Sequence, residues 1–151
     1  LSQSHARMGD VKRRERTRIL VQGSPELRSE LAREIATRYR VYTIADSAPG
    51  LVMTTMRETA RRSRFYLGEV LVTEAKVQVN GTLGLGIIAG EDDQAALELA
   101  VIDAAYNASL PETGPWQTRL YEEANVIARR TNAVEARILE TRVNFQTMDV
   151  D

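Results

Sequence analysis

The sequence predicts an α+β fold: an antiparallel sheet of about five strands, with two N-terminal and two C-terminal helices packed mainly on one face of it. Three patterns support this prediction. Apolar residues recur at helical spacing towards both ends of the chain, and β-branched residues alternate with polar ones in the middle. The dipeptide Asn80-Gly81 joins two of the alternating segments, and it is the strongest short-range signal for a β-hairpin.

Length and composition predict one domain. The chain has 151 residues, of which 43% are hydrophobic and 27% charged, as expected for a globular domain over residues 10–151. Residues 1–9 are polar and weakly patterned, so we expect a flexible arm there. The absence of cysteine and of any long apolar run favours a cytoplasmic protein with no membrane partner. A net charge of −1 disfavours nucleic acid as a partner.

Two helices are expected before the sheet. The first spans residues 10–21 within a strongly basic run, and Gly23 ends it. Ser24 and Pro25 then start a second helix, because Ser can accept from the orphan N–H groups and Pro suits the first helical position. Apolar residues at helical spacing carry this second helix to about Tyr39.

The middle of the chain has the composition of short strands separated by turns. Turn residues at 46–50 and the charged segment 57–64 divide it. Gly84 and Gly86 fall on one face of the last strand, where another backbone or a bulky side chain could approach closely. The expected strands are residues 41–44, 51–56, 65–72, 76–79 and 82–88.

Two further helices follow the sheet. Glu91, Asp92 and Asp93 open the first, because acidic residues are favoured at a helix N-terminus, and small apolar residues give it a face suited to close packing. The second begins after Pro115 and carries a narrow apolar stripe suited to one partner helix or a sheet. For residues 143–148 the alternation favours a short strand, and a helical extension remains open. The stripe comprises Leu120, Ala124, Ile127, Thr131, Val134 and Ile138.

The residue chemistry predicts no autonomous active site. Residues 84–89 match the relaxed dinucleotide pattern G-x-G-x-x-A, but they lie inside a hairpin strand and precede three acids that would repel a pyrophosphate. His5 is the only histidine and lies in the expected flexible arm. No catalytic residue, cofactor-binding residue or metal ligand is therefore predicted.

A basic loop supports an alternative function. Four arginines between two expected strands could bind an anion, because loops at the ends of strands often line sites. On that alternative the protein is a binding domain or an enzyme for a small phosphorylated ligand. A solvated surface is the more common explanation of such a run. The four are Arg57, Arg61, Arg62 and Arg64.

Several blocks occur in an order that resembles one known family. They begin with Arg18–Leu31 and continue with the segment from Thr73 to Gly84, Gly90-x-Asp92 and small residues spaced along the following helix. Arg129, Thr131 and Glu135 come next, before Arg142-Val143, Phe145 and Thr147-Met148. Together these blocks cover nearly the whole chain and resemble the PhnG family, a subunit of the bacterial carbon–phosphorus lyase core complex.

The resemblance implies a role in phosphonate catabolism. The complex (alpha-D-ribose 1-methylphosphonate 5-triphosphate synthase) displaces adenine from ATP by a phosphonate, and an iron–sulfur radical subunit later cleaves the C–P bond. The resemblance places these chemistries in sister subunits, so this chain is expected to be a scaffold without a cofactor of its own. Its expected partners are the other core subunits, with self-association when isolated. The candidate interface residues are Gly81, Thr82, Gly84, Gly86, Glu135, Arg142, Phe145 and Met148.

Overall fold

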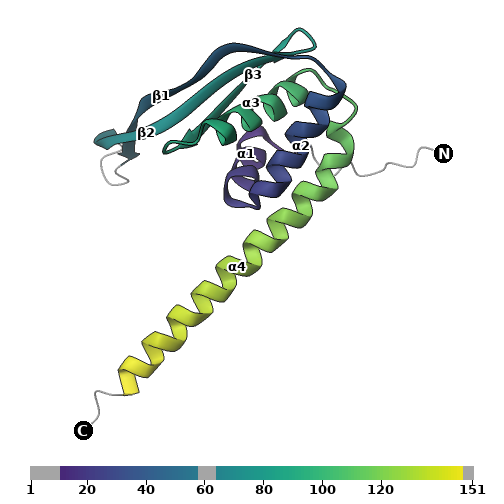
Figure 1. Ribbon diagram of the computed structural model, residues 1–151. Coiled ribbons are helices and arrows are strands. Elements are labelled where there is room, and N and C mark those ends of the chain that lie inside the picture. The colour runs from purple at the N-terminus through teal and green to yellow at the C-terminus, as the bar shows by residue number, and fades with distance from the viewer. Residues whose placement is uncertain (1–10, 58–63, 148–151) are drawn as a thin grey trace, which may run out of the picture. The chain divides into compact units, whose positions relative to one another are not determined.

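The computed structural model describes residues 11–57 and 64–147, without the side chains of 54–57, 64–67 and 142–147. Within these residues the chain is α+β, with four helices and one three-stranded antiparallel sheet (Figure 1). It divides into two compact units. Of the described residues, one unit contains 25–57 and 64–116, and the other combines 11–24 with 117–147. The expected flexible arm, residues 1–9, lies outside the described residues.

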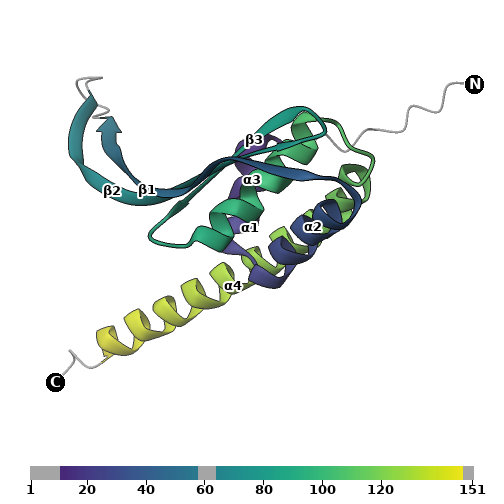
Figure 2. The same ribbon diagram turned by 45° about the horizontal axis from the view of Figure 1, so that its top comes forward.

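The sheet belongs to the first unit and has the strand order β1-β2-β3. These strands are β1 (Val41–Arg57), β2 (Arg64–Val79) and β3 (Thr82–Ala89). Asn80 and Gly81 form the β2–β3 turn with φ of 50° and 76°, as the Asn-Gly signal predicts. β3 pairs only with the Val72–Val79 half of β2, whereas β1 follows β2 along its whole length. Beyond β3, β1 and β2 therefore continue as a two-stranded ribbon (Figure 2).

The prediction of about five strands is wrong, because two expected interruptions do not break the sheet. The first is residues 46–50. The pairing of β1 with β2 shifts in register between Thr43 and Ala48, and it then continues with Pro49 opposite Thr73. Proline is tolerated there because β1 is an edge strand. The second lies between the expected strands 65–72 and 76–79. Here β2 stays paired with both β1 and β3 through Val72, Thr73 and Glu74. Thr73 is buried, and its hydroxyl donates to Gly90 O (2.6 Å) and accepts from Asp92 N (3.1 Å) in the loop before α3.

Helix α3 (Asp93–Asn107) covers one face of the sheet at very short range (Figure 1). Its first turn is capped by Asp92, whose Oδ1 accepts from Ala95 N at 3.0 Å, as the acidic opening predicts. A Cβ on Gly86 would lie 2.6 Å from Ala100 N and closer still to Ala96 O. Gly84 faces Ala104 in the same way. The close approach predicted for these glycines is confirmed, and α3 makes it.

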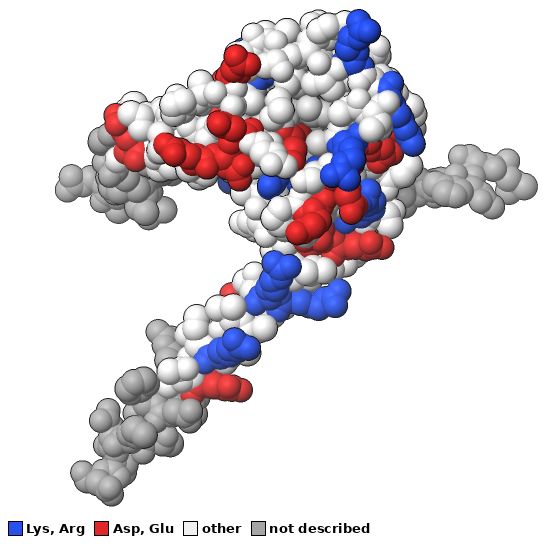
Figure 3. All heavy atoms as spheres, viewed as in Figure 1, with Lys and Arg blue, Asp and Glu red and all other residues white. Residues whose placement is uncertain are grey.

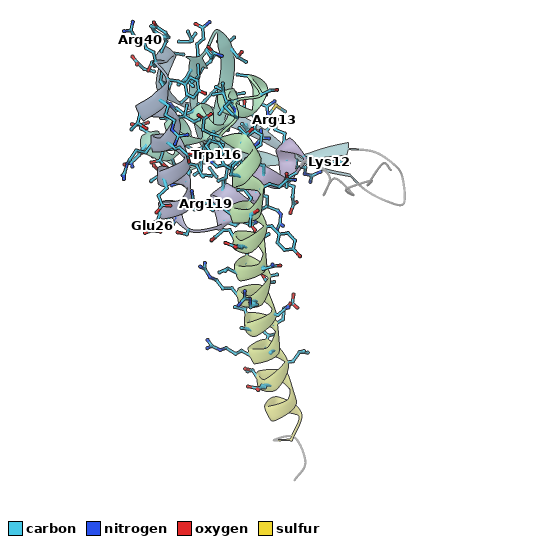
Figure 4. The ribbon with its side chains drawn as sticks, turned by 90° about the vertical axis from the view of Figure 1, so that its right-hand side faces the viewer. Lys12, Arg13, Glu26, Arg40, Trp116 and Arg119 are labelled. Carbon is cyan, nitrogen blue, oxygen red and sulfur yellow. The ribbon has the colours of Figure 1, made fainter. Side chains whose placement is uncertain are left out.

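Helix α2 (Pro25–Arg38) packs against α3 and completes the core of this unit. Leu31 and Ile35 are fully buried on it. Trp116, labelled in Figure 4, is 1% exposed, and its Nε1–H donates to Glu34 Oε2 of α2 at 3.0 Å. Four helices were expected to pack mainly on one face of the sheet. Only α2 and α3 belong wholly to this unit, so the prediction is tested here for these two helices alone.

The second unit contains α1 (Arg13–Gln22) and most of α4 (Thr113–Thr147). Gly23 ends α1 as predicted, and a Cβ there would lie 2.6 Å from Ile19 O and 2.7 Å from Glu123 Cγ. Ser24 N donates to Glu123 Oε1 at 2.7 Å, which joins the end of α1 to α4. The strand favoured for residues 143–148 is wrong, because α4 runs through Thr147. No helix among the described residues is long and apolar enough to cross a membrane.

The glycine contact with α3 yields a stability test. We expect Gly86→Ala to lower the free energy of unfolding by about 1–3 kcal/mol or more, because the added methyl meets helix backbone that cannot rotate away. The readout is the fluorescence of Trp116, the only tryptophan, during urea unfolding. Gly50→Ala is the matched control, since its Cβ would lie 3.6 Å from Val72 Cγ2, an ordinary contact. Equal losses in the two variants would contradict this account.

Candidate functional site

An open groove of about 390 Å³ lies between α2, α3 and the start of β1. This volume is within the range of small-molecule pockets. Most of its lining side chains are apolar or small, and its charged members are Arg33 and Glu98. The lining residues are Ser29, Ala32, Arg33, Ala36, Val41, Thr43, Gln94, Leu97, Glu98 and Val101.

The carboxylate of Glu98 is already occupied by partners within the chain. It accepts from Arg28 Nε, Ser29 Oγ and Gln94 Nε2, each at 2.9 Å. Both members of the Arg28–Glu98 ion pair are buried, with side-chain exposures of 9% and 11%. Because three donors from the chain already occupy this carboxylate, its role here is to fix α2 against α3.

The free edge of β3 is closed by side chains of α3. Leu85 N donates to Asp103 Oδ2 at 2.9 Å, and Asn107 Nδ2 donates to Leu83 O at 3.0 Å and to Asp103 Oδ2 at 3.3 Å. Residues 83 and 85 present their backbone groups to this edge, because Val79 and Thr82 flank a two-residue hairpin turn. The bonds occupy groups that an added strand would need. Pairing with a partner strand at this part of β3 is therefore disfavoured.

A second polar cluster ties the end of α2 to the loop before α4. Glu112 accepts from the hydroxyl of Tyr39 (3.0 Å to Oε2) and from Arg38 Nη1 (3.3 Å). Burial raises the pKa of the Glu112 carboxyl, but hydrogen bonds from its own backbone N–H, Tyr39 and Arg38 outweigh burial and lower that pKa. Burial and the hydrogen bond to Glu112 raise the pKa of Tyr39.

In the part of the β1–β2 ribbon beyond β3, most of the side chains that the structure describes are apolar and exposed. We call Gly50–Arg57 and Arg64–Leu71 the ribbon arm. Leu51 and Met53 are 65% and 64% exposed, and Val52, Val70 and Leu71 are also exposed. The last pair of its ladder is Arg57 opposite Arg64. Arg61 and Arg62 lie outside the described residues, so anion binding by the four arginines stays a prediction.

The apolar stripe of α4 changes from buried to exposed along the helix. Leu120 and Ile127 are buried, whereas Val134 and Ile138 are 56% and 55% exposed. Every residue from 128 to 141 is exposed. Figure 3 shows charged side chains spaced along this helix among uncharged ones. Glu135 lies in this exposed stretch. Arg142 and Phe145 belong to α4 but their side chains are not described, and Met148 lies outside the described residues.

The four predicted interface residues of the β2–β3 hairpin lie in different environments. Gly81 is exposed at the turn, and Thr82 is half-buried. Gly84 and Gly86 are buried against α3. No sequence pattern marks Glu98 as a core ion-pair residue or Asn107 as a residue that caps the edge of β3. Within the described residues, no group of three His, Cys, Asp or Glu side chains is placed to hold a metal ion.

The buried ion pair yields a test by paired substitution. Glu98→Leu alone should destabilise the fold by roughly 3–5 kcal/mol, because it leaves the Arg28 guanidinium buried without its carboxylate. The double variant Arg28→Met/Glu98→Leu should recover much of that loss, since apolar residues can fill the same space. Urea unfolding followed by Trp116 fluorescence gives both values. Additive losses in the double variant would show that the two residues do not act as a pair.

The Glu112 cluster predicts a pH dependence of stability. Folding lowers the pKa of this carboxyl below its ordinary value of 4.5, so its contribution is present above pH 4.5 and is lost as the pH falls through the folded-state pKa. Glu112→Gln should therefore be less stable than wild type at neutral pH, and the difference should shrink on acidification. Glu74→Gln, which removes a carboxylate at an exposed sheet position, is the control. A difference for Glu112→Gln that is constant with pH would contradict the assignment.

Comparison with known protein families matches most of the chain to one family model. The family model described as phosphonate metabolism protein PhnG matches residues 11–149, which include every helix and strand of the structure. The match covers well over half of the 151 residues. The chain therefore belongs to the PhnG family, the phosphonate metabolism subunit of the carbon–phosphorus lyase complex.

Proposed function

We propose that this chain is an accessory subunit of the carbon–phosphorus lyase core complex. In this role it takes part, by assembling with sister subunits, in the conversion of a phosphonate and ATP to ribose 1-phosphonate 5-triphosphate and adenine. It binds no cofactor of its own; ATP and the iron–sulfur radical chemistry are handled elsewhere in the complex. The family match supports the pathway, and the surface of α4 supports the assembly role.

The main observation that supports this proposal is the exposed half of α4. A stretch of 14 residues, from 128 to 141, is exposed throughout, yet it carries Val134, Ile138 and Leu139 at 55–60% exposure. An isolated helix of this length is marginal in water, because most helical stability in proteins comes from packing of an apolar face. A partner surface would supply that packing to the same stripe that Leu120 and Ile127 begin.

The polar groups of the chain support an accessory rather than a catalytic role. Glu98, Asp103 and Glu112 are the buried carboxylates of the described residues, and each accepts hydrogen bonds from within the chain. Catalytic carboxylates are instead directed at a substrate with an environment tuned for proton transfer. Here these carboxylates hold α2, β3 and the loop before α4 in place.

The assembly role predicts that polar substitutions on the α4 stripe dissociate the complex without unfolding the chain. We expect Val134→Asp/Ile138→Asp to remain folded, because both side chains are exposed, but to lose co-purification with the co-expressed sister subunits. Circular dichroism and Trp116 fluorescence check the fold, and native mass measurement checks the assembly. Turnover of a phosphonate and ATP by the reconstituted complex should fall in parallel.

Ala136→Asp is the matched control. Ala136 is exposed in the same stretch of α4 but lies on the opposite side of the helix from Val134 and Ile138, given 3.6 residues per turn. Ala136→Asp adds one negative charge, against two in the double variant, and should leave the assembly intact. A wild-type chain that stays monomeric beside its sister subunits would rule out the proposed function.

A further inference from the structure

The outer edge of β1 is open at the first residues of the strand. β1 is an edge strand, so one side of its backbone has no neighbouring strand. Val77 and Val79 of β2 direct their backbone groups to β3, because Val79 closes the two-residue hairpin turn with Thr82. Val41 and Thr43 lie opposite these two valines, so their own N–H and C=O groups point away from β2. Within the described residues, nothing forms a hydrogen bond with these outward groups.

Other stretches of the sheet edge are protected by the chain itself. Side chains of Asp103 and Asn107 cap the outer edge of β3. In β1, register shifts follow Thr43, and Pro49 has no N–H to donate. Both are common ways to prevent a foreign strand from pairing with a sheet edge. The first residues of β1 have neither protection.

The groove described above lies along this open edge. Side chains of directly opposite residues in a ladder share a face, so Val41 and Thr43 face the covered side of the sheet, and both line the groove. The facing walls come from Ala32 and Ala36 of α2 and Leu97 of α3. These two helices pack on each other, whereas α2 makes little direct contact with β1 (Figure 1). The space between β1 and α2 is therefore open to the side chains of a strand added to β1.

The charge of the groove comes from Arg33. Glu98, the other charged lining residue, is already paired with Arg28. Arg33 is exposed and has no ion pair or hydrogen bond with any residue that the structure describes. Its guanidinium is therefore available to a carboxylate from outside the chain.

These features together decide between occupants. A small molecule would fill the groove but leave the open backbone groups of β1 without partners. A second copy that added its own β1 would bring its own α2 to the same side of the joined sheet. Strands lie about 4.8 Å apart and packed helices about 8–10 Å apart, so the two α2 helices would compete for one space. An extended peptide without a helix of its own pairs with the edge and places alternate side chains in the groove.

We infer that the start of β1 and the groove beside it bind an extended peptide segment of another protein, which adds to β1 as a further strand. The segment carries aliphatic residues at alternate positions, whose side chains enter the groove, and an acidic residue that meets Arg33. The site lies wholly within the sheet-containing unit and is separate from the α4 stripe. It does not rest on the proposed function.

A set of short synthetic peptides tests the site. Each carries Val, Ile or Leu at two alternate positions, Asp or Glu at the next alternate position, and threonine between them. Fluorescence anisotropy of the labelled peptides, titrated with the full chain, gives the dissociation constants, and we expect saturable binding by members of this set. Alternate nitrogens of a strand face opposite edges, so methylating one of the two alternate series should weaken binding by about fivefold or more, and methylating the other should change little. Equal binding by both methylated series would overturn strand addition.

A proline substitution tests the edge from the protein side. Thr43→Pro removes an outward N–H and should weaken peptide binding by about fivefold or more. The ladder with β2 should persist, because Pro49 already occupies an outward position of this strand opposite Thr73. Thr43→Val keeps the N–H, and Leu51→Pro makes the same change outside the groove, so both controls should bind like wild type. Circular dichroism checks the fold, and an equal loss in Leu51→Pro would overturn the assignment to this edge.

A charge exchange tests the role of Arg33. Arg33→Glu should weaken binding of the acidic peptides by about two- to fivefold, the size expected for an exposed ion pair. Peptides with lysine in place of the acidic residue should show the reverse preference and bind Arg33→Glu more tightly than wild type. Equal affinity of both peptide types for both proteins would overturn the acidic residue of the segment.

The remaining outcomes also decide the question. If no peptide of the set binds wild type, the inference fails while the proposed function stands. A dimer of the chain that Thr43→Pro dissociates, without any peptide binding, would assign the edge to a second copy. Binding that Leu97→Gln weakens, but that Thr43→Pro and backbone methylation leave unchanged, would make the groove a pocket for side chains alone and overturn strand addition. The α4 variants test the proposed function separately, and their chains should bind the peptides as wild type does.

Discussion

The contact between the glycines of β3 and the backbone of α3 is the constraint on which the sheet-containing unit depends. Gly84 and Gly86 leave no room for a side chain on the face towards Ala96, Ala100 and Ala104. This close approach brings Asp103 and Asn107 within hydrogen-bonding distance of the outer edge of β3. It also fixes the helix from which Glu98 reaches α2. A wider spacing between helix and sheet would disturb all of these bonds together.

The same constraint explains which surfaces remain open. With one face of the sheet covered by α3 and one stretch of its edge capped, partners are left with the outer face, the groove beside α2 and the ribbon arm. Among these the arm has the most exposed apolar side chains. On the outer face, exposed Leu83 and Ile87 stand beside polar residues of β2, such as Gln78 and Glu74. A mixed surface of this kind is ordinary for one side of an antiparallel sheet.

Local chemistry made part of this fold predictable from the sequence. The starts of α2 and α3 and the Asn-Gly hairpin depend on neighbouring residues, so caps and turn preferences identify them. The continuity of β1 and β2 was missed, because bulges and an edge proline are recognised only when the partner strand is in place. For residues 143–148 the sequence fits both the helical and the strand period. The structure shows the helix, because α4 has 35 residues and ends only at Thr147.

The candidate surfaces were predictable to a smaller extent. The spacing of apolar residues predicts the α4 stripe. It does not show that the stripe is buried as far as Ile127 and exposed beyond it. The glycines of β3 signalled a close backbone, yet nothing in their spacing indicated that this backbone is α3 of the same chain. Arg28 and Glu98 are 70 residues apart, and no local pattern connects them. Such pairs arise from tertiary packing, which single-sequence patterns do not encode.

The proposed accessory role is consistent with the distribution of polar and apolar groups in the described residues. Its buried carboxylates are satisfied internally, so the interior is organised for rigidity, while large apolar side chains remain exposed on the ribbon arm and on α4. Both exposed elements need ordering, because a bare ribbon and a bare helix are each marginal in water. Part of the binding free energy is therefore used to order them, so affinity for partners should be lower than their apolar area suggests. An obligate complex can tolerate this cost, since its several interfaces form together and each raises the effective concentration for the next.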